Sequence, residues 1–327
     1  MRLVSLLPSA TEIVYALGLG DDLVGVTFEC DEPPYARDEK TVVVGGRDTA
    51  GMTPAEIDEY VRTQFAAGAD LYTLHADALA GLAPDLILTQ DLCRVCALPS
   101  GQVSTALDYL GCRADVVSLD PHSLDEVLDT IVEVGARTGV ADRAADLVGD
   151  LRRRLATVAA AVANRPRPRV AVVEWVDPPF TAGHWVPDLV HAAGGEPVAA
   201  RPGARSVETT WANLVAAAPD VVIVAPCGFH LDGAAEQARR VAPSFSKLAR
   251  ETAHNLSKLA RETAHNLSKL AREATHGRPD AQVWAIDADG IVVRPGPRLV
   301  DGVEAIAAIL HPDAGPSAPS NSIARVA

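Results

Sequence analysis

The segment from Ala141 to Asn164 constrains the fold of this chain more than any other part of the sequence. Its apolar residues recur at spacings of three and four, which predicts one unbroken apolar stripe along a helix; they are Ala144, Val148, Leu151, Leu155, Val158 and Val162. At about 1.5 Å per residue, this helix would be about 36 Å long and could cross a whole domain. The sequence RPRP at 165–168 then ends the helix, because proline lacks the amide hydrogen that a helix needs.

Units of one strand followed by one helix occur on both sides of this helix. Apolar runs such as Leu23–Thr27 and Asp220–Ala225 alternate with helix-length segments, a pattern typical of parallel sheets. We therefore expect an α/β protein of two Rossmann-like lobes with parallel sheets, joined by a long backbone helix and with a ligand cleft between the lobes. The predicted parts are an N-terminal lobe at 1–122, linker helices at 123–168 that include the backbone helix at 141–164, a C-terminal lobe at 169–312 and a loose tail at 313–327.

Composition and charge exclude several classes of protein. The chain has 327 residues, 48% of them hydrophobic, which is enough for two domain cores. A formal net charge of −14 argues against binding to nucleic acid or to an anionic membrane. No run of about 20 apolar residues could span a bilayer, and the apolar run at 3–7 is too short for a signal peptide. We expect a cytoplasmic protein as the sequence stands, with its five cysteines reduced.

An exact repeat interrupts the C-terminal lobe. The sequence SKLARETAHNL fills 246–256 and again 257–267, and a third, divergent copy begins at 268. Eleven residues fit three helical turns, so the leucines of the copies share one face, which predicts an extended helix at 244–277. Two interpretations remain open: a tandem duplication that lengthens a surface helix, or an arm that makes this an interaction protein, by self-association through 246–277 or with another partner.

Reactive side chains follow the predicted strands. Ligands of open parallel sheets bind beyond the carboxyl ends of the strands, and the candidate ligand-binding residues there are Ser9, Glu29, Cys30, Arg47, Trp175, Phe180, His184, Trp185, Cys227, His230 and Arg294. We expect Trp175, Phe180 and Trp185 to form apolar walls. Arg47 or Arg294 would pair with acidic groups of a small-molecule ligand.

Thiols and imidazoles in this set favour a transition metal or a cobalt-containing ligand. The candidate metal ligands are Cys30, Cys93, Cys96 and His184. The Cys93-x-x-Cys96 spacing serves zinc sites and redox pairs equally, and no second Cys-x-x-Cys is present. The alternative interpretation is that these cysteines pack as small hydrophobic residues at tight turns.

Enzyme motifs are scarce in this sequence. It contains no Gly-x-Ser-x-Gly elbow, no Gly-x-x-x-x-Gly-Lys phosphate loop and no His-Glu-x-x-His motif. We therefore expect a binding protein that is not an enzyme and requires no cofactor. The alternative is a cytoplasmic thiol-dependent metal-handling or redox enzyme that uses Cys30, Cys93 and Cys96.

Four segments of the sequence resemble a known family. They are LVSLLPSATEIVYALGLGDDLVGVTFECDEPP at 3–34, LAPDLILTQDLC at 82–93, DPPFTAGHWVPDLVHAAGGE at 177–196 and RPGPRLVDGVEAIAAIL at 294–310. Together they are similar to the cobalamin-binding proteins among the helical-backbone periplasmic binding proteins, which serve ABC importers and are usually periplasmic or on the cell surface. The resemblance implies two Rossmann-like lobes, a rigid connecting helix, and a corrinoid or metal chelate bound between the lobes.

The resemblance also implies roles for single residues. Phe180, within the sequence PFTAG at 179–183, falls on a turn that faces the ligand. Glu29 or Cys30 takes the place of a tyrosine that commonly touches corrin, and Arg47 lies near a position that is often tryptophan. Because these departures replace aromatic rings with a thiol and charges, a related chelate or a cobalamin precursor remains an alternative ligand.

Members of that family also dock on an ABC permease through one acidic residue on each lobe. The first-lobe position aligns with Asp77. The second aligns near Ala212, which carries no charge, and Glu208 is the nearest acidic residue. The resemblance therefore implies a possible permease partner for which one docking carboxylate is missing.

Overall fold

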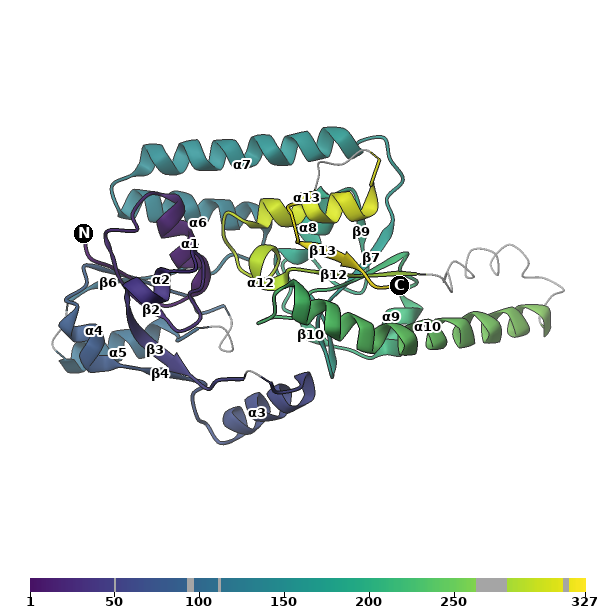
Figure 1. Cartoon of the computed structure of the whole chain (residues 1–327), viewed down its shortest axis with the longest axis horizontal. Helices are drawn as coiled ribbons and strands as arrows, with labels where there is room; N and C mark the ends of the chain where they lie inside the picture. Colours follow the sequence, from purple (N-terminus) through teal and green to yellow (C-terminus); the bar gives the residue numbers. More distant parts are fainter. Residues whose placement is uncertain (50, 93–96, 111–112, 263–280, 314–317) are drawn as a thin grey trace. The chain divides into compact units, whose positions relative to one another are not determined.

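A computed structural model describes residues 1–49, 51–92, 97–110, 113–262, 281–313 and 318–327 of the chain. The chain divides into two compact units, each built on one sheet (Figure 1). Unit 1 comprises Met1–Pro121, Asp125–Arg152 and Arg294–Pro297, and unit 2 comprises His122–Leu124, Arg153–Val293 and Arg298–Ala327. Among the described helices, none combines the length and the apolar character needed to cross a membrane.

The sheet of unit 1 has six strands in the order β4-β3-β2-β1-β5-β6. They are β1 (Leu3–Ser5), β2 (Leu23–Thr27), β3 (Thr41–Gly46), β4 (Tyr72–Leu74), β5 (Leu86–Thr89) and β6 (Asp115–Ser118). All neighbours are parallel except the edge pair β3 and β4. The central strand β1 is wholly buried, as expected for a parallel strand covered on both faces.

Unit 1 has helices on both faces of this sheet. Its helices are α1 (Pro8–Ala16), α2 (Ala36–Glu39), α3 (Pro54–Ala66), α4 (Ala76–Gly81), α5 (Ser100–Leu110) and α6 (Leu124–Arg137), of which α3 lies apart from the sheet (Figure 1). The helices α4 and α5 pack on one face, where Leu79, Val103 and Leu107 join strand residues in a buried cluster. Figure 1 shows α1 and α6 on the opposite face.

The sheet of unit 2 follows the order β10-β8-β7-β11-β12-β13, and β9 pairs with β7. Its strands are β7 (Arg169–Val176), β8 (Pro179–Thr181), β9 (Glu196–Pro197), β10 (Val207–Glu208), β11 (Val221–Val224), β12 (Gln282–Ile286) and β13 (Ile323–Arg325). The pairs of β7 with β9 and β11, and of β11 with β12, are parallel, whereas β8, β10 and β13 are antiparallel to their neighbours. The predicted parallel strands form the centre of the sheet, and antiparallel strands extend it on both sides.

The chain end does not form only a loose tail, because β13 pairs with β12 through Ile323–Arg325. The helices of unit 2 are α8 (Val186–Ala192), α9 (Trp211–Ala216), α10 (Leu231–Glu262), α12 (Ala288–Ile291) and α13 (Leu299–Leu310). Figure 1 shows α8 and α13 on one side of the sheet and α9 and α10 on the other. Small residues of α10, such as Ala238 and Ala242, pack against the sheet in the buried core.

The helix predicted at 141–164 is observed as α7 (Ala141–Val162), 22 residues long. Its residues up to Arg152 belong to unit 1 and those from Arg153 to unit 2. Within unit 1, Ala144 packs closely on Gly135 of α6. Within unit 2, Arg154 donates a 2.9 Å hydrogen bond from Nε to Glu304 of α13 and also pairs with Asp301. Each half of α7 is thus anchored to the unit to which it belongs.

The helix that carries the repeat begins earlier than the sequence predicts. The helix α10 starts at Leu231 and continues through Pro243 to Glu262, whereas the expected start was residue 244. Burial of Ala234, Ala238 and Phe245 against the sheet accounts for helix on both sides of the proline. The rest of the predicted helix at 244–277 lies outside the described residues.

Candidate functional site

In unit 1 the carboxyl ends of the strands lead into α1 and into the loop after β2. Ser9 lies in the first turn of α1 and is only 3% exposed. Cys30 is fully buried; Thr11 donates a hydrogen bond to its Sγ at 3.0 Å and the amide of Thr27 donates another at 3.4 Å. Both side chains, predicted to face a ligand, are therefore buried in unit 1.

The buried position also changes the chemistry of the Cys30 thiol. Burial raises its pKa, and the hydrogen bonds from Thr11 and Thr27 counteract this only in part. A raised pKa keeps the sulfur protonated, whereas a metal ligand or nucleophile must be a thiolate. Cys93 and Cys96, the other two candidate thiols of this unit, lie outside the described residues.

Two further candidates of unit 1 lie nearer the surface. Glu29 is half-buried and accepts a hydrogen bond at 3.3 Å from the hydroxyl of Tyr72. Arg47 is exposed, and its guanidinium lies 4.6 Å from the centre of the Tyr60 ring, within the range of a cation–π contact. Both side chains can reach a ligand at this edge.

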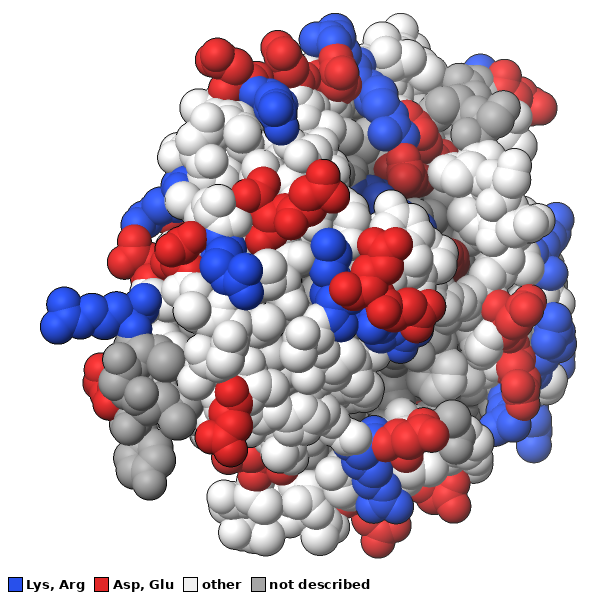
Figure 2. Space-filling view, turned by 60° about the vertical axis from the view of Figure 1, so that its left-hand side comes forward, with Lys and Arg blue, Asp and Glu red and all other residues white. Residues whose placement is uncertain are grey.

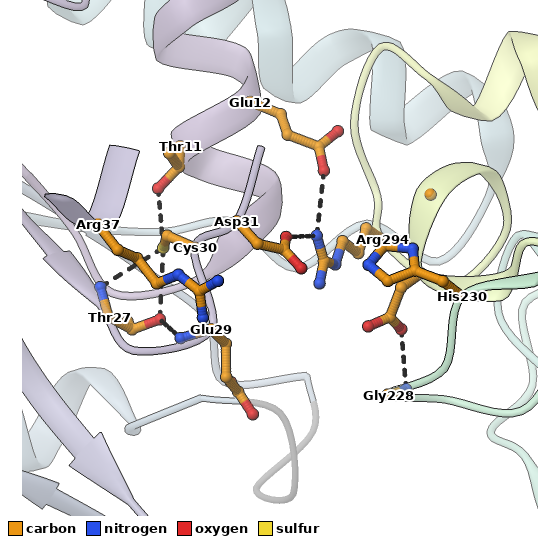
Figure 3. Close-up of polar contacts among 12 residues, drawn as sticks. Thr11, Glu12, Thr27, Glu29, Cys30, Asp31, Arg37, Gly228, His230 and Arg294 are labelled. Carbon is orange, nitrogen blue, oxygen red and sulfur yellow. Dashed lines mark hydrogen bonds and ion pairs between the residues drawn. The ribbon is translucent and has the colours of Figure 1, made fainter. Parts of the chain in front are cut away.

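Arg294 forms a buried ion cluster in unit 1 (Figure 3). It is hydrogen-bonded to Asp31, and its Nη1 lies 3.7 Å from Oε1 of Glu12. The side chains of Arg294 and Glu12 are 10% and 3% exposed. The arginine expected to meet acidic groups of a ligand is therefore paired with two carboxylates of its own unit. Neither carboxylate was among the predicted residues.

The hairpin of β7 and β8 carries the aromatic candidates of unit 2. Trp175 and Phe180 lie opposite one another in the antiparallel ladder, so their side chains share one face of the sheet. The indole of Trp175 donates a hydrogen bond at 3.2 Å to the backbone oxygen of Asp177, which fixes the ring. Both rings are half-buried.

His184 lies in a constrained turn after β8. Its φ is +52°, and its amide donates a 2.6 Å hydrogen bond to the backbone oxygen of Ala204. The rings of His184 and His122 are 6.0 Å apart between centres. Burial, with the positive field of His122 and Arg205, lowers the pKa of His184. In the described part of the chain its buried Nε2 has no hydrogen-bond partner. A neutral imidazole with an available nitrogen is thus held beside a second imidazole.

Trp185 differs from the prediction, because it is a core residue of unit 2. It is 6% exposed, and its indole nitrogen donates a 2.9 Å hydrogen bond to the backbone oxygen of Val292. This bond joins positions 107 apart in sequence. Local sequence therefore could not predict that the ring turns inward.

The loop after β11 and the start of α12 form a polar cluster in unit 2 (Figure 3). Nδ1 of His230 lies 2.9 Å from Oδ1 of Asp287, and the amide of Gly228 donates a 2.8 Å hydrogen bond to Asp289. Cys227, in the same loop, is half-buried. Cys227 and His230 were predicted because they follow the carboxyl end of a strand. Asp287 directly follows β12 in the same way, but the sequence analysis did not select it.

The described residues contain no group of three or more His, Cys, Asp or Glu side chains that could hold a metal ion. The permease-docking candidate Asp77 is exposed in the first turn of α4. Figure 2 shows acidic and basic side chains intermingled on the face in view. The described site residues offer aromatic rings, imidazoles and single charges.

An α/β protein of two units with candidate binding groups at the ends of its strands has the fold of a class III periplasmic binding protein. The sequence model of the periplasmic binding protein family matches residues 3–248. This chain belongs to that family, and the fold class predicted from the sequence is confirmed.

Several known proteins are similar to this chain. A cobalamin-binding protein of Halobacterium salinarum is 28% identical over 247 residues, which cover 74% of this chain and 58% of that protein. A vitamin B12-binding protein of Vibrio cholerae is 24% identical over 312 residues, covering 94% of this chain and 88% of that protein. The crystal structure of a periplasmic heme-binding protein from Pseudomonas aeruginosa superposes on this chain with a TM-score of 0.64 at 21% identity. The match covers 99% of this chain and 97% of that protein. This chain spans less than two thirds of the Halobacterium protein.

Proposed function

We propose that this chain is a substrate-binding protein that holds a corrinoid, or a closely related metal chelate, and serves an ABC importer. The observation that carries the proposal is its similarity to proteins named for cobalamin and vitamin B12 in two organisms. The corrinoid is a ligand in this proposal and not a cofactor. Because a protein that serves an importer meets its ligand outside the cell membrane, the proposal implies a periplasmic or cell-surface location in place of the cytoplasmic one expected from the sequence.

The candidate residues that remain near the surface support a large flat ligand. Binding pockets for such molecules are lined mainly by aromatic and apolar side chains with a few polar groups. Unit 2 offers Trp175 and Phe180 on one face of its sheet, next in the chain to the turn of His184. We propose that the ligand contacts Trp175, Phe180, His184, Cys227 and His230 of unit 2; Glu29 and Arg47 of unit 1 remain candidates that the sequence predicts.

The buried thiol of Cys30 weakens the enzymatic alternative. A thiol-dependent enzyme needs an accessible thiolate, whereas burial raises the pKa of Cys30 and removes its sulfur from solvent. Members of the periplasmic binding protein family are binding proteins and not enzymes, which agrees with a role without catalysis.

Isothermal titration calorimetry with cyanocobalamin tests the proposal. A separate titration with iron protoporphyrin tests the alternative ligand. We expect saturable one-to-one binding of cyanocobalamin, weakened at least about fivefold by Phe180→Ala, because truncating a well-packed aromatic contact commonly costs more than about 1 kcal/mol. Phe65→Ala is the matched control, because Phe65 is a 43% exposed phenylalanine of unit 1 outside the proposed site. Binding of the porphyrin alone would overturn the assignment of the ligand.

We also propose that Asp77 is a docking residue for the permease, because it is an exposed carboxylate in the first turn of α4. The variant Asp77→Lys should reduce stimulation of the reconstituted permease's ATPase activity while corrinoid affinity stays the same. Glu59→Lys on α3 is the control, an equal charge change at an exposed position. Equal losses in both variants would contradict a specific role for Asp77.

A further inference from the structure

The imidazole of His230 has a carboxylate partner but remains largely exposed. Its Nδ1 lies 2.9 Å from Oδ1 of Asp287, and its side chain is 57% exposed while that of Asp287 is 19% exposed. The same carboxylate caps α12 by accepting a hydrogen bond from the amide of Gly290 at 3.1 Å. Asp287 is therefore fixed by the helix, and it orients the imidazole.

The carboxylate also determines which ring nitrogen of His230 carries the proton. Nδ1 of His230 and the amide of Gly290 both lie within hydrogen-bond distance of the same oxygen, Oδ1 of Asp287. An ionised carboxylate can only accept hydrogen bonds, so Nδ1 must be the donor. In the neutral imidazole the lone pair then lies on Nε2, which is the arrangement of histidines that bind metals.

The backbone around His230 is held on both sides. The amide of Gly228 donates to Oδ1 of Asp289 at 2.8 Å, and the amide of Asp289 donates to the backbone oxygen of Phe229 at 3.3 Å. The backbone oxygen of His230 accepts from the amide of Ala234 at 3.0 Å, within the first turn of α10. The loop after β11 is thus tied to the start of α12, and the imidazole is presented on a rigid base.

The residue before His230 carries an aromatic ring. The ring of Phe229 is 6.1 Å from the ring of Trp175 between centres, at an interplanar angle of 51°. Both residues are half-buried, so part of each ring reaches the surface. An oriented nitrogen donor and an aromatic ring on the same loop suit a metal ion set in a flat apolar macrocycle.

We propose that Nε2 of His230 is an axial ligand of the cobalt ion in a bound corrinoid and that Asp287 is its positioning residue. The inference rests on the proposed function. The described residues hold no three-ligand metal cluster, and none is needed, because the corrin supplies four nitrogen ligands itself. In the binding step the Nε2 lone pair forms a bond to Co(III) and the axial water leaves as water. The oxidation state does not change, and the proton stays on Nδ1.

The test compares aquacobalamin, whose axial water exchanges, with cyanocobalamin, whose cyanide blocks that position. Binding to the full chain is followed by absorption spectroscopy and calorimetry. We expect aquacobalamin to bind at least about tenfold more tightly, with the spectral shift that free imidazole produces, because an oriented metal ligand adds affinity on this scale. The variant His230→Ala should lose the shift and reduce aquacobalamin affinity to that of cyanocobalamin.

Two further variants sharpen the assignment. Asp287→Asn should weaken aquacobalamin binding about tenfold, the usual cost of losing the carboxylate behind a metal-bound histidine. His254→Ala is the matched control, an exposed histidine on α10, and it should behave as the wild type. A shift that persists in His230→Ala, or equal affinities with no shift in the wild type, would overturn the inference while corrinoid binding stands. Failure of both cobalamins to bind would overturn the proposed function as well.

Discussion

Replacing Arg294 distinguishes a structural role from the ligand-binding role that the sequence predicts. In unit 1 this arginine is hydrogen-bonded to Asp31, and it lies 3.7 Å from Glu12. The variant Arg294→Met keeps the length of the side chain but removes the cation that lies 3.7 Å from the carboxylate of Glu12, which is 3% exposed. Breaking a buried ion pair commonly costs about 3–5 kcal/mol. Because the Asp31 side chain is 25% exposed and partly hydrated, we expect a loss of about 3 kcal/mol, at the lower end of that range.

The aromatic residues of the chain allow each unit to be followed separately. All four tryptophans belong to unit 2, and all five tyrosines belong to unit 1. Urea unfolding can therefore be followed by tyrosine near-ultraviolet circular dichroism for unit 1 and by tryptophan fluorescence for unit 2. With a slope of about 2 kcal/mol per M urea, a loss of 3 kcal/mol moves the midpoint of unit 1 down by about 1.5 M.

The matched control is Arg62→Met, which removes a 54% exposed arginine from a surface ion pair with Asp58. Exposed pairs contribute about 0–1 kcal/mol, so the midpoint of unit 1 should move little. The double variant Glu12→Gln/Arg294→Met should recover part of the loss, because it also removes the buried charge of Glu12. An unchanged midpoint in Arg294→Met, together with weaker cyanocobalamin binding, would refute the structural role and support the ligand-binding role.

Three further predictions concern buried groups. Trp185→Phe should lower the free energy of unfolding of unit 2 by about 1–3 kcal/mol in urea melts, because the oxygen of Val292 loses its donor. Iodoacetamide at pH 8 should leave Cys30 unmodified in the folded protein, as peptide mass mapping would detect, because burial raises its pKa. Burial, followed by the charges of His122 and Arg205, lowers the pKa of His184 in the folded protein. As the pH falls, the imidazole of the unfolded chain is therefore protonated before that of the folded chain. Unit 2 should therefore lose stability as the pH falls below about 6.5, and His184→Asn should lose less in fluorescence-monitored melts.

Periodicity predicted the backbone of this fold well. Apolar residues spaced three and four apart identified α7 to within two residues of its observed end. This worked because the apolar face of a helix is a local pattern of the sequence. Strand and helix alternation likewise predicted the parallel centres of both sheets. The antiparallel strands β4, β8, β10 and β13 were missed, because strands of two or three residues carry little periodic signal and are defined by their partners.

The candidate site was predicted less completely, since strand-end position does not determine side-chain direction. Cys30 and Trp185 both follow strands, yet both side chains are buried through partners distant in sequence, Thr11 and Val292. His230 also follows a strand, but its side chain is exposed and oriented by Asp287. Only the fold brings these partners together, and the useful signal that was missed was the acidic residue directly after β12.

The distribution of charge among the candidate residues bears on which metal chelate fits. Of the two arginines expected to meet acidic groups, Arg294 already pairs with Asp31 and Glu12, while Arg47 lies over the ring of Tyr60. A ligand with two carboxylates would have to compete with these contacts for its counter-ions, whereas an amide-bearing corrinoid needs only neutral hydrogen-bonding groups. Desolvating an unpaired carboxylate costs much more than desolvating an amide. We therefore expect cyanocobalamin to bind more tightly than iron protoporphyrin, and the reverse order would contradict this assignment of the arginines.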